Sequence, residues 1–421
     1  MNFCKTKWIR IKSVFLLCAT ILVSISDFAF ANFAYVSDQV NNVFVIDTVT
    51  NAVIATISVG TTPTGLAITP DAKFVYVTNL NSDNVSIIDV ATNVVMATIQ
   101  FDTGTSPGDV AITPNGRFAY VVNGMTIFPG SISIIDTTTH AITATIPAAD
   151  NPFIVAIMPN GEFAYVSNVF SNEISIIDTT TNSIIGTVVG GVQPAGIAFT
   201  PDGQLAFVAD TSGIVFVINT TTNTISATIT VGMDTGEVAV TPNGQFVYAT
   251  NFSSSDVSVI NASTFSITAT ITVPGSQPSG IAITPDGQFV YVASQSSPIG
   301  AFVIDTKTNA IVSSISLSGT PYAVAITPSP FAPKNLTGHQ KKNDFGVEYE
   351  LFNELQWEGN SFGPVVSGYF IYRNGIKIAT LSADIFEYED HNIKKGASNA
   401  YDVIAFDSNG VLSESVTIVI K

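Results

Sequence analysis

Pro-Ser-Gly-Ile-Ala-Ile-Thr-Pro-Asp-Gly-Gln-Phe-Val-Tyr-Val, residues 278–292, is the stretch that decides the fold of this chain. It holds two short apolar runs joined by Pro285-Asp286-Gly287, which predicts a tight turn because Pro fixes φ and Gly accepts a positive φ. Two further runs follow at Ala301–Asp305 and Ala310–Ile315. All four are rich in Val, Ile, Phe and Tyr and are bounded by turn-forming residues, so they predict four antiparallel strands.

The same unit recurs along most of the chain. A proline that follows Thr, or Met158 in one copy, marks each unit, at positions 70, 114, 159, 201, 242, 285 and 328. A spacing of 41 to 45 residues with four strands per unit is typical of a propeller blade, a four-stranded sheet packed between two neighbours. Coverage of both faces explains runs such as Phe289–Val292, which are apolar without alternation.

The two ends of the repeat region complement each other. The first unit begins at Phe33 and lacks the inner strand that precedes this motif elsewhere, whereas the last inner strand, Ala323–Thr327, has no following partner. We therefore expect the last strand to complete the first blade. This closure predicts a ring of seven blades without an open edge.

A recurring tetrapeptide connects the repeats to a known family. Tyr76-Val77-Thr78-Asn79 has close variants in most other units, at Tyr120–Asn123, Tyr165–Asn168, Phe207–Asp210 and Tyr248–Asn251. With segments such as Asp178–Asn182 (Asp-Thr-Thr-Thr-Asn), it resembles the YVTN-repeat propellers over residues 32–328. The resemblance implies a seven-bladed β-propeller exported from a prokaryotic cell, of the surface-layer or periplasmic type, but it does not imply one chemistry.

The composition changes after residue 328. Residues 329–335 read as a proline-punctuated linker, and residues 336–421 do not repeat the propeller unit. In this part, Val366–Arg373 followed by Asn374-Gly375 predicts a strand that enters a hairpin.

The same region resembles a second family. With Trp357 upstream of this strand and Tyr401 downstream, the region resembles a fibronectin type III domain. The resemblance implies an immunoglobulin-like β-sandwich in which the Tyr401 hydroxyl ties back to the upstream chain. The expected fold is therefore all-β, with a propeller over 32–328 and a fibronectin type III-like domain over 336–421.

Residues 1–31 read as a secretory signal peptide. Basic residues precede an apolar core, Val14–Ile25, and Ala29-Phe30-Ala31 forms a small-x-small cleavage site. We expect export to a periplasm, the cell surface or the medium, with a retained membrane anchor as the alternative. Both cysteines, Cys4 and Cys18, lie in this leader, so the mature chain would contain no disulfide.

The net charge of the chain limits the classes of partner that it can bind. The formal net charge is −17, and residues 32–328 contain only three fixed positive charges, Lys73, Arg117 and Lys307. Nucleic acids need a basic groove, which these residues cannot form. Proteins, glycans or small ligands on a propeller face are the expected partners of a monomeric protein.

The sequence lacks the common catalytic motifs. The histidines, His140, His339 and His391, are far apart, and no zinc, nucleophile-elbow or phosphate-loop motif is present. His140 lies in one of the Asp-Thr-Thr-Thr-Asn-like turns, where we expect it to be solvated. Catalysis would have to rest on carboxylates, with or without a metal ion.

One face of the predicted ring differs from blade to blade. The position just inside the start of each inner strand holds, in chain order, Gly65, Asp109, Ile154, Gly196, Glu237, Gly280 and Ala323. Asp109 and Glu237 should therefore point at the channel mouth from three blades apart. Hard cations take carboxylate oxygens, so these two are candidate ligands of a divalent cation such as calcium. A hydrated channel lined by acids is the alternative.

Loops of the same face complete the candidate ligand-binding site. They place Asp102, Asp150 and Asp234 near the mouth, and the longer loop that follows Asn123 adds the apolar Met125 and Phe128. Loops on a rigid scaffold are common binding positions. Asn123 itself ends a tetrapeptide, where it would either contact a ligand or cap the strand.

These features favour an exported, non-catalytic binding, adhesion or scaffold protein that uses the variable face of the propeller. The alternative is an enzyme of the lactonase or lyase type, with carboxylates and a divalent cation at the channel mouth. That alternative rests on analogy, because such enzymes occur on related propellers.

Overall fold

The computed structural model describes residues 32–420 apart from 125–129, 274–276, 297–299, 329–332, 345–348, 360–365, 392, 395–396, 408–412 and 414. The predicted signal peptide and the loop residues Met125 and Phe128 therefore lie outside the described residues. None of the helices in the described part has the length and apolar character needed to cross a bilayer.

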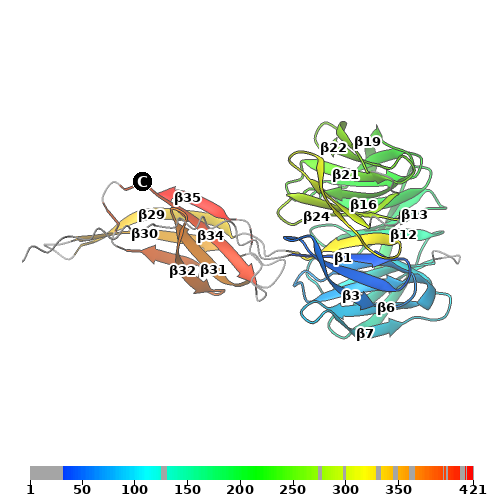
Figure 1. Ribbon diagram of the computed structural model, residues 1–421, viewed down its shortest axis with the longest axis horizontal. Helices are drawn as coiled ribbons and strands as arrows, with labels where there is room; N and C mark the ends of the chain where they lie inside the picture. Colours follow the sequence, from blue (N-terminus) through cyan, green and yellow to red (C-terminus); the bar gives the residue numbers. More distant parts are fainter. Residues whose placement is uncertain are drawn as a thin grey trace, which may run out of the picture.

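Seven four-stranded antiparallel sheets contain the described strands up to residue 326, as the sequence predicts (Figure 1). We number them as blades 1 to 7. The strands of blades 1 to 3 are β28 (Pro321–Ile326), β1 (Phe33–Asp38), β2 (Asn42–Asp47) and β3 (Ala52–Ser58); β4 (Pro63–Ile68), β5 (Phe74–Asn79), β6 (Asn84–Asp89) and β7 (Val94–Gln100); and β8 (Pro107–Ile112), β9 (Phe118–Asn123), β10 (Ser131–Asp136) and β11 (Ala141–Pro147). A short 3₁₀ helix, η1 (Leu80–Ser82), follows β5.

The other four blades repeat the same order. Their strands are β12 (Pro152–Ile157), β13 (Phe163–Asn168), β14 (Glu173–Asp178) and β15 (Ser183–Val189); β16 (Pro194–Phe199), β17 (Leu205–Asp210), β18 (Ile214–Asn219) and β19 (Thr224–Thr230); β20 (Thr235–Val240), β21 (Phe246–Asn251), β22 (Asp256–Asn261) and β23 (Ser266–Thr272); and β24 (Pro278–Ile283), β25 (Phe289–Ser294), β26 (Ala301–Asp305) and β27 (Ala310–Ile315).

The chain closes the ring with its last inner strand, which confirms the expected closure. β28 pairs antiparallel with β1, where Ala34 faces Ile326 and Val36 faces Val324. Beyond the ladder, the Phe33 amide donates to Thr327 Oγ1 at 2.9 Å. Blade 1 therefore joins residues that are almost 300 positions apart in the sequence.

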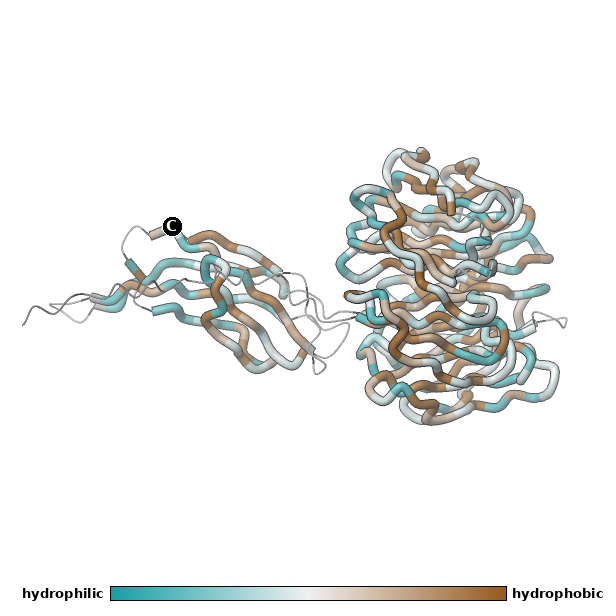
Figure 2. Tube along the Cα trace, in the orientation of Figure 1, coloured by the Kyte–Doolittle hydropathy of each residue, from teal (hydrophilic) through white to brown (hydrophobic). Residues whose placement is uncertain are grey.

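Apolar packing between adjacent blades forms the core of the ring. Seven buried clusters each combine residues of two neighbouring blades, including blades 7 and 1, where Phe44 and Ile46 pack with Tyr291 and Val303. The second strand of each blade is buried on both faces, which explains its unbroken apolar sequence. Hydrophobic residues accordingly recur along the strands of the ring in Figure 2.

A tyrosine hydroxyl joins most blades to the outer turn of the next blade. Tyr35 Oη donates to Asn93 Oδ1 at 3.2 Å, and Tyr291 Oη donates to Asn51 Oδ1 at 2.5 Å across the closure of the ring. The same bond joins Tyr120 to Asn182, Tyr165 to Asn223 and Tyr248 to Asn309. These asparagines have φ near +55°, which Asn tolerates better than most residues, so the repeated turns serve blade packing.

Two interfaces replace this contact with a different pair. His140 stands where other blades have Asn, and its Nδ1 lies 2.7 Å from Tyr76 Oη while its ring meets Phe74 edge-on. The expectation that His140 is simply solvated is therefore wrong. Between blades 5 and 6, Phe207 and Phe265 replace the polar pair, and their ring centroids lie 6.2 Å apart.

The strands after residue 333 form two further antiparallel sheets. Their orders are β29 (Lys334–Asp344), β30 (Tyr349–Glu358), β33 (Glu387–Asp390), and β32 (Ile376–Ser382), β31 (Val366–Arg373), β34 (Asn399–Asp407), β35 (Val416–Ile420). β31 has the predicted bounds. The sequence did not predict β29 or β33, and β29 begins inside the expected linker.

Buried aromatic side chains hold these two sheets together. Trp357 and Tyr369 share one apolar cluster with Tyr401. Tyr401 Oη also donates to Asp390 Oδ2 at 2.6 Å, and Asp390 in turn pairs with Arg373 at 2.8 Å.

Ring closure predicts unequal effects of two truncations. A chain that ends at Gly319 lacks β28 and exposes the edge of β1, so it should aggregate and melt at least about 10 °C lower than a chain that ends at Ser329. Both truncated chains lack residues 334–421, so thermal melting and light scattering compare the ring alone. Equal melting temperatures would contradict the account of closure.

Candidate functional site

A cavity of about 400 Å³ lies where the inner strands of the seven blades meet. Its rim includes Thr211, Phe252 and Gln295, each of which directly follows the end of a blade's second strand. The cavity therefore opens on the face that comparison of the repeats marks as variable. Its size is at the lower end of the usual range for small-molecule sites.

A β-bulge near the start of every inner strand turns side chains into this cavity. In blade 3, for example, Pro107 pairs with Asn123 and Val110 pairs with Val121, so Gly108 and Asp109 are left out of the ladder. The other six inner strands show the same shift of register. Bulges re-aim side chains in this way.

In four blades, the hydroxyl of a Ser or Thr at the third position of the repeated tetrapeptide accepts a hydrogen bond from the bulged backbone, whereas Val122, Ala209 and Ala293 occupy this position in the other three. The Gly65 amide donates to Thr78 Oγ1 at 2.7 Å, and the Glu237 amide donates to Thr250 Oγ1 at 3.1 Å. The Ile154 amide likewise donates to Ser167 Oγ at 3.1 Å. A repeated Thr or Ser beside the channel is thus explained by local structure.

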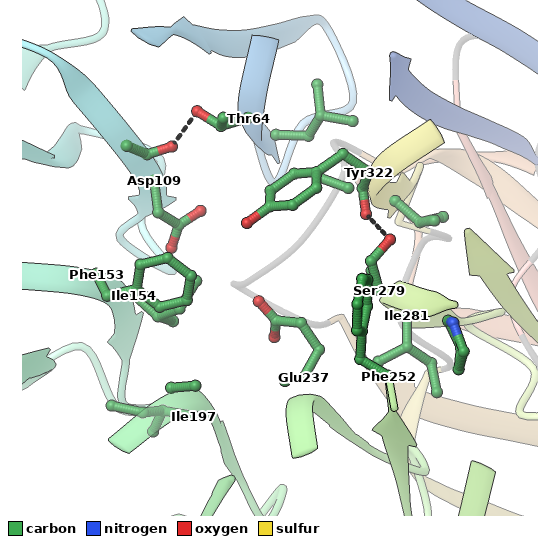
Figure 3. A pocket seen from close by; sticks show the side chains of 18 of the residues that line it. Thr64, Asp109, Phe153, Ile154, Ile197, Glu237, Phe252, Ser279, Ile281 and Tyr322 are labelled. Atoms are coloured by element: carbon green, nitrogen blue, oxygen red, sulfur yellow. Dashed lines mark hydrogen bonds between the residues drawn. The ribbon is translucent and has the colours of Figure 1, made fainter. Parts of the chain in front are cut away.

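Three polar side chains converge in the cavity from different blades (Figure 3). Asp109 comes from blade 3, Glu237 from blade 6 and Tyr322 from blade 1. Asp109 Oδ2 accepts a hydrogen bond from the Val155 amide at 3.1 Å, which fixes one of its two oxygens. Figure 3 shows the carboxyl groups and the Tyr322 hydroxyl pointing toward the same space.

A glycine in the preceding blade makes room for each carboxylic acid. A Cβ atom at residue 65 would lie 2.7 Å from Asp109 Cα and 2.8 Å from its Oδ1. A Cβ atom at residue 196 would lie 2.7 Å from both Glu237 Cα and Oε2. Gly65 and Gly196 are therefore positioning residues, because any side chain there would displace the neighbouring acid.

The surroundings of the two acids favour their neutral forms. Burial raises the pKa of Asp109 to about 7, although hydrogen bonds from Val155 and Val110 oppose the shift. Burial, together with the charge of Asp109, raises the pKa of Glu237 to about 8. Burial and the two acids also raise the pKa of Tyr322, so its hydroxyl stays protonated.

No positive side chain balances these acids among the described residues that line the cavity, since the lining contains neither Lys, Arg nor His. Phe153, Ile154 and Ile197 form an apolar side next to the carboxyl groups (Figure 3). The cavity therefore combines two unpaired acids with an apolar surface.

The structure gathers some of the predicted site residues and separates others. Asp234 lines the cavity with Asp109 and Glu237, and Asp234 Oδ2 accepts a hydrogen bond from Ser253 at 3.1 Å. Asp102 and Asp150 are exposed and do not belong to the described lining.

Asn123 caps its strand inside the blade. It is 2% exposed, and its amide donates to Ser131 and Ser133 at 3.2 and 2.9 Å. Of the two interpretations that the sequence left open for this position, the structure fits the cap. The predicted neighbours Met125 and Phe128 lie outside the described residues.

Comparison of the repeats at one position does not reveal the three aromatic residues of the described lining. Tyr322 and Phe153 occupy the second position of their inner strands, where the other blades have Thr64, Gly108, Ala195, Gly236 and Ser279. A comparison at this second position would have found both aromatic residues. Phe252 follows a tetrapeptide directly, and no pattern of the sequence singles it out.

The described residues contain no group of three or more His, Cys, Asp or Glu side chains that could hold a metal ion. Hard cations usually take six or more oxygen ligands. Asp109 and Glu237 alone supply fewer oxygen ligands than a calcium ion usually takes.

The sequence profile of the lactonase, 7-bladed beta-propeller family matches residues 65–223 and 211–327. The chain belongs to this family. Among curated proteins, none matches this lactonase-family chain by sequence.

Solved structures resemble this lactonase-family propeller in fold. A functionally unknown protein from Desulfotomaculum acetoxidans is 22% identical with a TM-score of 0.63, covering 70% of this chain and 99% of that one. Kuenenia stuttgartiensis hydrazine synthase is 22% identical with a TM-score of 0.59, over 65% and 92% of the two chains. Dihydro-heme d1 dehydrogenase NirN is 15% identical with a TM-score of 0.55, over 70% and 75%. At these identities the likeness concerns the fold alone.

The raised pKa values predict how the two acids affect stability. A carboxyl group with a raised pKa binds a proton more tightly in the folded state, so the unfolding free energy falls as pH rises from about 4 to about 8. The double variant with Asp109→Asn and Glu237→Gln has no such carboxyl groups, so its unfolding free energy should not fall in this way. The double variant should match the wild type at pH about 4 and exceed its unfolding free energy by several kcal/mol at pH about 9, since each pKa raised by about 3 corresponds to about 4 kcal/mol.

Melting curves over this pH range test the prediction. Asp286→Asn is the matched control, because Asp286 lies exposed in a turn where other blades have Asn115, Asn160 and Asn243. A double variant with the same pH dependence as the wild type would show that the acids are not buried as described.

Proposed function

We propose that this protein is an exported, non-catalytic binding protein that receives a small ligand in the axial cavity. The observation that supports the proposal is the convergence of Asp109, Glu237 and Tyr322 on one cavity of ligand size. Bulges and neighbouring glycines place these side chains, and ring packing does not require two acids at an apolar centre. Burying such groups costs free energy, which a ligand can offset.

Export and the type of repeat are parts of the same proposal. The leader of residues 1–31 and the Tyr-Val-Thr-Asn repeats support an exported propeller of the YVTN type, and N-terminal sequencing of exported protein should begin at Asn32. A mature chain that still begins at Met1 would contradict export with cleavage.

The C-terminal sheets support the proposal of a fibronectin type III-like module. A three-stranded sheet faces a four-stranded sheet, and Tyr401 ties to Asp390 and Asn353. We propose that this module joins the propeller through a protease-sensitive segment near residues 329–333. Limited proteolysis that yields no stable fragment would contradict this boundary.

The mature chain allows a direct test of access to the cavity, because both cysteines of the chain are Cys4 and Cys18. Ala323→Cys places a single thiol in the lining, and Gln288→Cys places one in an exposed turn. At pH about 8.5, a cationic methanethiosulfonate should modify residue 323 at least about tenfold faster than an anionic one, relative to residue 288.

Adding Asp109→Asn and Glu237→Gln should abolish that preference for the cationic reagent. A thiol at position 323 that reacts with neither reagent would mean that small molecules do not enter the cavity, and the proposed function would then be wrong.

A lactonase is the second candidate function, because the family profile and the acid pair favour it. Near neutral pH, Asp109 could take a proton from water as the water oxygen bonds to the lactone carbonyl carbon. The Tyr322 hydroxyl would donate to the oxyanion, and protonated Glu237 would protonate the ring oxygen as its bond to that carbon breaks. The product is a hydroxy acid, and solvent returns the proton from Asp109 to Glu237.

A divalent cation such as calcium stays part of this second candidate. Asp109 and Glu237 would hold it, but two carboxyl groups are too few for a resident ion, so the ion would have to arrive with its substrate.

Hydrolysis of lactones separates the two functions. A pH-stat measures the hydrolysis of δ-gluconolactone and γ-butyrolactone with and without calcium. We expect the wild-type protein to hydrolyse both lactones no faster than the double variant that carries Asp109→Asn and Glu237→Gln. An acceleration of about 100-fold or more that both substitutions abolish would instead establish the lactonase.

A further inference from the structure

The arrangement of polar groups in the cavity narrows the chemistry of its ligand, provided that the proposed binding function is correct. Asp109, Glu237 and Tyr322 stand on blades 3, 6 and 1, so they are separated by two or three blades around the ring. Their oxygens consequently approach the axis from three sides, as Figure 3 shows.

These oxygens are largely free to accept hydrogen bonds. The Asp109 carboxyl accepts hydrogen bonds from the Val155 and Val110 amides, which leaves further acceptor positions on its two oxygens. The Tyr322 side chain is half-buried, and no described residue forms a hydrogen bond with its hydroxyl. Because this hydroxyl faces the cavity, a ligand or solvent there completes its hydrogen bonding.

Large apolar side chains form part of the cavity wall beside polar residues such as Ser279 and Gln295. Phe153, Ile154 and Ile197 lie on one side of the acids, and Phe252 and Ile281 lie across from them (Figure 3). A ligand whose charged end reaches the three oxygens must therefore lay a hydrophobic body against these side chains.

We propose that the cavity binds a primary amine as its ammonium ion, with the nitrogen between Asp109, Glu237 and Tyr322 and the carbon skeleton against the apolar wall. An ammonium group carries three N–H donors, which matches three acceptors arranged around an axis. It also supplies the positive charge that the described lining lacks.

Electrostatics favours the cation over neutral ligands of the same shape. The charged groups that face the site are Asp109 on β8, Glu237 on β20 and Asp234 at the rim, and all are acids. A bound ammonium would lower the pKa of Asp109 and Glu237 from their raised values, because an opposite charge favours the ionised form. Binding near neutral pH should therefore release protons to solvent.

A series built on one carbon skeleton tests the ligand class by calorimetry at pH about 8. The compounds are phenethylamine, its N-trimethylated derivative and phenethyl alcohol, with calcium chloride as a metal probe. We expect phenethylamine to bind at least about tenfold more tightly than either of the other two compounds. The alcohol lacks the positive charge, and the trimethylated cation lacks N–H donors. The binding heat should vary with buffer ionisation, which reports the released protons.

Variants locate the binding in the cavity. Tyr322→Phe removes only the hydroxyl and should weaken phenethylamine binding about tenfold, whereas Asp109→Asn or Glu237→Gln should weaken it more. Gly196→Ala should weaken it as well by displacing Glu237, although both acids remain. Asp286→Asn, in the exposed turn, should leave the affinity unchanged.

The outcomes separate this inference from the proposed function. If the alcohol, the trimethylated cation or calcium binds as tightly as the amine and depends on the same residues, the cavity binds ligands but the amine assignment is wrong. If no compound binds, or if the cavity variants bind phenethylamine like the wild type, the amine proposal and the axial binding site both fail.

Discussion

The contact between adjacent blades is the interaction on which the rest of this structure depends. Each blade is apolar on both faces and has no core of its own, so it is stable only between two neighbours. That requirement forces closure, which β28 provides by pairing with β1. It also explains the tyrosine bonds, since each hydroxyl fixes the outer turn of the next blade while its ring fills the interface.

Closure has a consequence at the centre of the ring. Seven inner strands converge on one axis, and each bulges there, so two residues per strand leave the ladder. In four of the blades a Thr or Ser hydroxyl of the second strand holds the bulged backbone, and in the other three Val122, Ala209 and Ala293 take that position without loss of the bulge. The bulge residues can therefore vary between blades without loss of the fold, and this chain uses that freedom to place two acids and a tyrosine in an apolar channel.

The sequence was sufficient for the ring but insufficient for parts of the site. Units such as Pro278–Val292 combine turn chemistry with apolar runs, and both are local signals. Asp109 and Glu237 were found because they interrupt a repeated pattern. Tyr322 interrupts a different position of the inner strand, one residue before the position that Asp109 and Glu237 occupy in their own strands.

Two other features could not be predicted from the sequence, for physical reasons. The contact of His140 joins residues 64 positions apart, which no local pattern reveals. β29 and β33 are rich in charged and polar residues, so their strands form through pairing with β30 rather than through an apolar run of their own.

The central claim is that ring closure holds Asp109 and Glu237 in one cavity whose described lining contains no positive side chain. Carbon-13 NMR of the two side-chain carboxyl carbons over pH, assigned with Asp109→Asn and Glu237→Gln, measures this directly. The account predicts titration midpoints at about 7 and about 8, both moving down when phenethylamine is added. Midpoints near 4 for both residues, as in solvated carboxyl groups, would contradict it.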